Sequence, residues 1–254
     1  MTDGDPHVTR RKALAGIGAV GFATMGMGLG RRTGSFDEYP NYTYAESDAP
    51  ARLLVGWRST YNGVVDEASI DPDDEIGDVQ LIDLDDVLPG DEGTASVGLR
   101  LEDDGEMVSE GVRVWMQIDA NLDDDDPNAL AANEALAARI ELDIRYDDGI
   151  LGIGGCGGAE SEFADLGEPI FSGTLAEAGS DGDLATGFQL DPGVFDNGCL
   201  GPDDRCCLAF AWSFPPGLGN VGKGGTVDFD VTFRAVSCDR SENPFPDSEN
   251  GGSA

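Results

Sequence analysis

The sequence has few cations and almost no histidine. Its 254 residues include 50 acids against 15 bases, and only two of the bases are lysines, Lys12 and Lys223. The formal net charge of -35 leaves no cationic surface for phosphate groups, which argues against a nucleic-acid partner. The single histidine, His7, stands ahead of an apolar segment near the N-terminus. Histidine-based nucleophile relays and HExxH-type zinc hydrolysis are therefore excluded for the rest of the chain.

The acidic residues are spread along the whole chain and are not gathered in one tail. Such a chain repels itself at ordinary salt, but at molar salt the Debye length falls to about 3 Å and the repulsion is screened. We interpret the composition as that of a salt-in halophile, such as a haloarchaeon, so the charge reflects the solvent and not a ligand. A disordered acidic chain is the competing interpretation. The 40% of apolar residues and the strand periodicity argue against it.

Residues 1–34 have the pattern of an export signal or a membrane anchor helix. The twin arginines Arg10 and Arg11 precede a 17-residue uncharged run, 13–29, which favours the twin-arginine export route. Sec export stays open because Ala13 stands where that motif usually has phenylalanine. A permanent anchor is the other alternative, although the run is shorter than the roughly 20 residues that span a bilayer. An extracellular or cell-surface location follows from either.

The segment between Cys207 and Cys238 predicts a terminal β-hairpin. Its second arm, 227–235, alternates apolar and polar residues, which is typical of a strand with one buried face. Its first arm, 208–214, is almost wholly apolar and predicts a central strand covered on both faces. Nothing in this hairpin has a catalytic pattern, so its side chains are expected to form core.

The rest of 51–238 contains further short strands and one helix. We expect about eight strands in all, hence an all-β, jelly-roll-like β-sandwich with a short helical insertion, in one domain over 51–238. A polar segment, 35–50, precedes it, and a low-complexity tail, 239–254, is expected to be disordered. The expected strands are 52–58, 79–87, 94–101, 112–118, 139–146 and 170–175, the helix is 127–138, and the main loops are 59–78, 147–168 and 179–205.

The five cysteines all lie in the second half of the chain. In an exported protein they indicate disulfides, and their odd number leaves one thiol free or bonded to another chain. A zinc site built from cysteine and carboxylate ligands is the alternative. Spacing does not define the pairing. The candidates are Cys156, Cys199, Cys206, Cys207 and Cys238.

Acidic loops offer oxygen ligands for calcium, the one metal that the residue types favour. No loop has EF-hand spacing, and in a halophile a solvated acidic loop is the simpler interpretation. The calcium candidates are Asp71, Asp73, Asp74, Glu75, Asp147 and Asp148, with a further run at 123–126. Separately, Asn41-Tyr42-Thr43 is an N-glycosylation sequon, which makes Asn41 a candidate for a glycan on an exported loop.

Five blocks of the sequence, in order, resemble a known family. They are the leader 10–21, Leu88-Pro89-Gly90-Asp91, the segment 140–148, the segment 170–176, and 208–238. Together they resemble haloarchaeal proteins with a SipW-cognate class signal peptide, which are related to TasA and camelysin. The chain departs from that family at 31–38, where the family usually has an AFFSDTE-like segment.

The resemblance implies a TasA-like jelly roll and assembly into extracellular biofilm fibres. In such fibres a subunit donates an N-terminal strand to the next one, which is β-strand addition. Here the donor would lie within 35–58, with Leu53, Val55 and Trp57 able to fill a groove. Camelysin is described as a metalloprotease, but the lack of histidine after the leader gives no support for that activity here.

We therefore expect an exported, non-enzymatic surface or matrix protein with no cofactor apart from the calcium candidate. Its expected partners are further copies of itself or other cell-surface proteins, with membrane contact only through an uncleaved N-terminal segment. The alternative is a monomeric calcium- or glycan-binding surface module. A secreted hydrolase is a third hypothesis, because acidic residue pairs are common in the sequence although nothing in it places two of them across a cleft.

Overall fold

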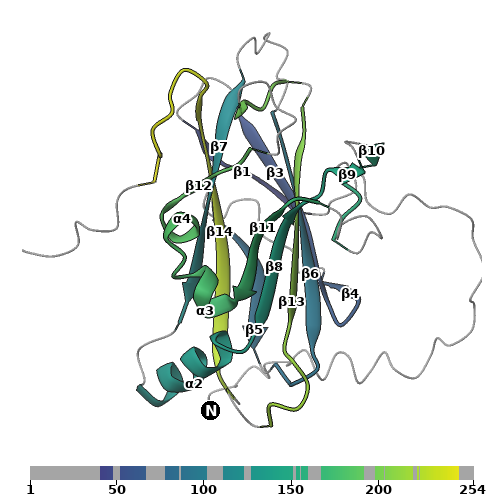
Figure 1. Cartoon of the computed structure of the whole chain (residues 1–254), viewed down its shortest axis with the longest axis vertical. Coiled ribbons are helices and arrows are strands. Elements are labelled where there is room, and N and C mark those ends of the chain that lie inside the picture. Colours follow the sequence, from purple (N-terminus) through teal and green to yellow (C-terminus); the bar gives the residue numbers. More distant parts are fainter. Residues whose placement is uncertain are drawn as a thin grey trace, which may run out of the picture. The chain divides into compact units, whose positions relative to one another are not determined.

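The fold comes from a computed structural model that describes a defined set of residues within the compact unit Thr33–Ala254 (Figure 1). The predicted leader, 1–34, lies outside that set. Among the described residues, no helix is long and apolar enough to cross a membrane. The described ranges are 41–47, 52–66, 78–85, 87–101, 111–122, 127–150, 153–154, 156–159, 167–191, 198–202, 204–219, 222 and 224–245.

Two sheets, antiparallel apart from the pairing of β2 with β14, form the body of the described part. Sheet A has the order β1 (Asn41–Tyr44), β3 (Leu53–Tyr61), β6 (Glu92–Leu101), β13 (Cys206–Ser213), β8 (Glu141–Tyr146) and β11 (Pro169–Thr174), with β4 (Val64–Asp66) also paired to β3. Sheet B has the order β12 (Phe188–Gln189), β7 (Val112–Asn121), β14 (Thr226–Ser237) and β2 (Glu46–Ser47), with β5 (Asp78–Asp85) also paired to β14. The smaller elements are β9 (Gly149–Ile150), β10 (Ile153–Gly154), α2 (Pro127–Ala137), α3 (Leu175–Ala178) and α4 (Gly182–Thr186).

The strand pairing is that of a jelly roll. Strand β5 pairs with β14, β6 with β13, β7 with β12, and β8 with β11, so the chain folds back on itself in four nested antiparallel pairs. From β5 to β8 and again from β11 to β14 the strands alternate between the two sheets, which wraps these pairs into a sandwich. The predicted all-β sandwich is confirmed, and the predicted helical insertion is α2.

The predicted terminal hairpin is wrong. Strands β13 and β14 lie in different sheets and do not pair with each other. Each is a central strand of its own sheet, and their apolar faces meet in the core, where Phe210 of β13 contacts Phe229 of β14. Alternating polarity shows which face of a strand is buried, but it does not show whether the next strand lies beside it or across from it.

Strand β3 and its turn were missed in part. The predicted loop 59–78 begins too early, because β3 continues to Tyr61 and turns back into β4. The turn is formed by Asn62 and Gly63, both with positive φ, 48° and 74°. An Asn-Gly pair at such a turn is a strong hairpin signal, and it was available in the sequence. The predicted loops 147–168 and 179–205 likewise contain β9 and β10, and α4 and β12.

The predicted polar segment 35–50 contributes to both sheets. Residues 41–44 pair with β3 in sheet A, and 46–47 run parallel to β14 in sheet B. Ala45, between them, is buried and donates its backbone N–H to the Leu53 carbonyl at 3.0 Å. This segment therefore joins the edges of the two sheets.

The predicted disorder of the tail is wrong for its first part. Phe245 is only 5% exposed and lies against the Arg234 guanidinium, 5.0 Å from ring centroid to Cζ. The Asn243 amide donates to the Thr186 carbonyl at 2.9 Å. The Phe245 ring thus attaches 239–245 to β14, and the Asn243 amide attaches it to the end of α4. Residues 246–254 lie outside the described part.

Candidate functional site

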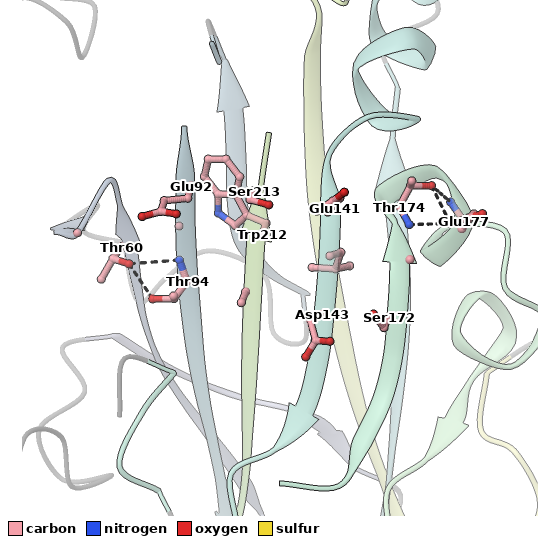
Figure 2. Close-up of a pocket in the computed structure, with 15 residues that line it drawn as sticks. Thr60, Glu92, Thr94, Glu141, Asp143, Ser172, Thr174, Glu177, Trp212 and Ser213 are labelled. Carbon is pink, nitrogen blue, oxygen red and sulfur yellow. Dashed lines mark hydrogen bonds between the residues drawn. The ribbon is translucent and has the colours of Figure 1, made fainter. Parts of the chain in front are cut away.

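A groove lies on the outer face of sheet A. Its volume is about 860 Å³. The strands β3, β6, β13, β8 and β11 all contribute to it, together with the start of α3 (Figure 2). We call it the outer groove. Its lining residues are Thr60, Gly63, Glu92, Gly93, Thr94, Glu141, Leu142, Asp143, Ser172, Gly173, Thr174, Glu177, Ala211, Trp212 and Ser213.

Small side chains on the central strand create the floor. On β13, Leu208, Phe210 and Trp212 are buried and belong to the core, so Ala211 and Ser213 point to the other face. The register places Ala211 between Thr94 of β6 and Asp143 of β8. Ala211 is exposed although its strand is central. Here the outward side chains of β13 are shorter than those of β6 and β8 on either side of it. The surface is therefore lower along β13 than along its two neighbours, which forms the groove.

The acidic residues of the groove follow from the same register. Ser213 lies between Glu92 of β6 and Glu141 of β8, and Figure 2 shows the two glutamates on either side of it. Both glutamates are exposed. Asp143 is engaged by Arg145, whose Nη2 donates to Oδ2 at 3.1 Å and whose Nε donates to Oδ1. Among the described residues no lysine, arginine or histidine lines the groove, so its charge is negative.

Hydrogen bonds hold two of the walls. Thr60 and Thr94 share a hydroxyl–hydroxyl bond of 2.7 Å between β3 and β6. On the opposite side, Thr174 caps α3, because its hydroxyl accepts from the Glu177 N–H at 3.2 Å while its own N–H donates to the Glu177 carboxylate at 2.7 Å. Because these bonds already fix the side chains of both walls, a ligand that binds there does not have to order them and avoids that entropic cost.

A disulfide-anchored loop covers the same face further along β13. The Cys156–Cys207 disulfide attaches this loop to β13, and the Ala159 N–H donates to the Ser96 hydroxyl at 2.7 Å. Cys207 and Ala209 share the outward side with Ala211, yet both are buried. The outer groove is thus closed at the end toward Cys207.

Asp147 supports this loop from below. It is only 2% exposed, and its Oδ2 accepts the Gly158 N–H at 2.8 Å. Its Oδ1 is buried and has no hydrogen-bond partner in the described part of the chain. Burial raises the pKa of the Asp147 carboxyl above its ordinary value of 3.8, and the charge of Asp148 adds to the rise, while the N–H groups of Gly158 and Gly157 oppose it.

Four of the five cysteines are paired in disulfides. Besides Cys156–Cys207, Cys199 is bonded to Cys238. Cys206 is the free thiol, and it is buried, where loss of solvation first and the charge of Asp148 second raise its pKa to about 12. The disulfides agree with an oxidising environment.

Only some of the calcium candidates lie in the part of the chain that the structure describes. Asp71, Asp73, Asp74, Glu75 and the run 123–126 lie outside the described part. Asp147 and Asp148 are described, and the unpartnered Oδ1 of Asp147 is one hard oxygen donor. Calcium takes six to eight oxygen ligands. No group of three or more His, Cys, Asp or Glu side chains that could hold a metal occurs among the described residues.

The other predicted site residues are not brought to the outer groove. Leu53, Val55 and Trp57 lie in β3 and are buried in the core. Asn41 begins β1, opposite Trp57, so the sequon is in an edge strand and not in a loop. Arg10 and Arg11 lie outside the described part.

No single stretch of the sequence indicates the outer groove. Most of its residues belong to five strands, which the register of sheet A brings together. The apolar segment 208–214 predicts a strand covered on both faces. That prediction holds at Ala209, which is buried, but fails at Ala211, which is exposed.

Comparison with known proteins found no match. No protein-family model matches the chain, and neither a search of curated proteins nor a search of solved structures found a similar one.

Proposed function

We propose that the chain is an exported, non-enzymatic surface or matrix protein whose subunits assemble into fibres by β-strand addition. The resemblance of the sequence to the TasA and camelysin group motivates this proposal. The observation that best supports it is the pairing of 41–47 with an edge of each sheet. Both disulfides are consistent with an extracellular site.

The segment 41–47 is suited to exchange between copies. It lies outside the nested pairs of the jelly roll and is held by four register pairs to β3 and two to β14. If this segment left its own subunit, β3 would lose its partner along one edge, and β14 would lose its partner on the side of Arg234 and Ala235 that faces away from β7. The identical segment of a second copy fits the same edges, which is the logic of a domain swap.

The exchanged strand is shorter than the range 35–58 that the resemblance implies. Strand β3, with Leu53, Val55 and Trp57, makes nine register pairs with β6 and contributes three side chains to the core. Removing it would open the sandwich. We therefore assign the exchanged part to residues up to Ser47, and β3 to the body of the acceptor subunit.

Electron microscopy of the exported protein at molar salt tests the proposal. We expect fibres from the parent chain and discrete particles from a variant lacking 35–47. A synthetic peptide of residues 35–47 should bind this variant, whereas a peptide of the same composition in scrambled order should not. Deleting 246–254 is the matched control and should leave fibres intact. A parent chain that stays monomeric at every salt concentration would refute assembly.

A monomeric binding module remains the second candidate function. The observation that favours it is the outer groove, with its exposed carboxylates and ordered walls. If this module binds calcium, we expect the melting temperature of the protein to fall when a chelator is added.

A further inference from the structure

We infer that the outer groove is a binding site for a neutral glycan. Its volume of about 860 Å³ lies in the range of small-molecule sites, about 300–1,000 Å³, and is far larger than a single ion needs. The inference rests on the groove alone and does not depend on fibre assembly.

The polar groups available to a ligand are carboxylates and hydroxyls. Within the described part of the chain, no hydrogen bond occupies the side chains of Glu92, Glu141, Ser172 or Ser213, although all four line the groove. Carboxylates accept hydrogen bonds only, whereas serine hydroxyls both donate and accept. A sugar hydroxyl also donates and accepts, so a row of them satisfies this mixed set. Bonds from hydroxyls to carboxylates are charge-assisted and stronger than those between neutral groups.

The lining excludes other ligand classes. Among the described residues no cationic side chain lines the groove, and its carboxylates would repel a phosphate, sulfate or uronate. A lipid or other apolar ligand would cover carboxylates without satisfying them. A cationic peptide would rely on exposed ion pairs, which contribute little and are screened at the molar salt that the composition indicates.

A divalent cation would find too few ligands in the groove. Glu92 and Glu141 lie on β6 and β8, with β13 between them. Neighbouring strands are about 4.8 Å apart, so the two backbones are about 10 Å apart. Calcium needs six to eight oxygens at about 2.3–2.6 Å, and no cluster of three suitable side chains occurs among the described residues. Glu92 and Glu141, one on each side of Ser213, can instead accept hydrogen bonds from different hydroxyls of one extended ligand.

The floor and the closed end define how a glycan would lie. Ala211 leaves the middle of the groove open, and the loop fixed by Cys156–Cys207 blocks the channel beyond it. A chain entering from the Ser213 end would pass between Glu92 and Glu141 and stop at the loop. This geometry favours the end of an oligosaccharide over its interior.

The test uses the full exported protein at molar salt and an array of neutral oligosaccharides that covers the common hexose, pentose and N-acetylhexosamine linkages. Binding to at least one neutral oligosaccharide is expected. Ala211→Trp fills the floor and should abolish it, while Ala131→Trp, at an exposed alanine of α2, is the matched control and should not. Glu141→Gln should weaken binding about tenfold, because it removes one charge-assisted acceptor.

Three results would overturn the inference. They are an array on which nothing neutral binds, an Ala211→Trp variant that binds as the parent does, and a preference for polyuronates. Calcium titrated alone provides a further arm, and calcium binding that Glu141→Gln removes would replace the glycan with a metal. Ala211→Trp leaves 41–47 untouched, so it should still form fibres. Failure of glycan binding and failure of assembly are therefore separate outcomes.

Discussion

Phe210 and Phe229 meet edge to face in the core, with their ring centroids 6.5 Å apart and their planes inclined by 70°. The two rings come from consecutive strands that lie in opposite sheets. Their contact therefore joins sheet A to sheet B. The sequence pattern wrongly predicts that the same two strands pair side by side as a hairpin.

Truncating either ring should destabilise the sandwich strongly. Both phenylalanines are fully buried, so we expect Phe210→Ala or Phe229→Ala to lower the free energy of unfolding by about 3–5 kcal/mol. A double-mutant cycle from denaturant unfolding should give a coupling of about 0.5–1.5 kcal/mol. The control cycle pairs Phe210 with Phe245, which packs on Arg234, and should be additive. A Phe210–Phe229 cycle without coupling would contradict the contact.

Asp147 should make stability fall as the pH rises. Burial raises its pKa in the folded protein, so between the ordinary value of 3.8 and the raised one the folded state binds more protons than the unfolded state. The free energy of unfolding then decreases with increasing pH across that window, and above it the buried charge keeps its full cost. Asp147→Asn still accepts from Gly158 and should be more stable than the parent at neutral pH.

The measurement is the melting temperature of parent and Asp147→Asn as a function of pH. Because the many other acids also titrate, the readout is the difference between the two curves, which should widen as the pH rises. Glu134→Gln, at an exposed position of α2, should run parallel to the parent. Curves of Asp147→Asn and parent that stay parallel would show that Asp147 is not destabilised by burial.

Cys206 should be unreactive in the folded protein. Its side chain is buried and its pKa is raised to about 12, so almost no thiolate is present at neutral pH and a reagent has no access. We expect no reaction with a thiol reagent in native buffer and one equivalent after unfolding. Cys206→Ala should lose that equivalent and keep the fold. Rapid labelling of the native parent would contradict the burial of this thiol.

The start of the tail should contribute to stability. Phe245→Ala removes a buried ring and its contact with the Arg234 guanidinium, with an expected loss of about 2 kcal/mol in the free energy of unfolding. Asn243→Ala should lose less, since its amide bonds lie at the protein surface. Deletion of 246–254 is the control and should leave the melting temperature unchanged. An equal melting temperature for Phe245→Ala and parent would mean that the tail is not attached in solution.

Several elements were predictable because their signals are local. The alternation of 227–235 placed β14 and its buried face, and Pro127 after a run of aspartates marked the start of α2. The signal of the Asn62-Gly63 turn is equally local, although the predicted loop 59–78 does not include a hairpin there. Hydrophobic periodicity and turn-forming residues each involve only a few neighbouring residues, so a short stretch of sequence is enough to recognise them.

By itself the sequence determined the all-β class, most strand positions, the buried faces and the excess of negative charge. Only the tertiary structure decided that β13 and β14 face each other across the core, that Cys156 pairs with Cys207, and that Phe245 folds back onto Arg234. It also decided the outer groove, because Ala211 forms a floor only where β6 and β8 flank it in one register. Pairing between distant strands depends on loop closure and core packing over the whole chain, and no single segment encodes it.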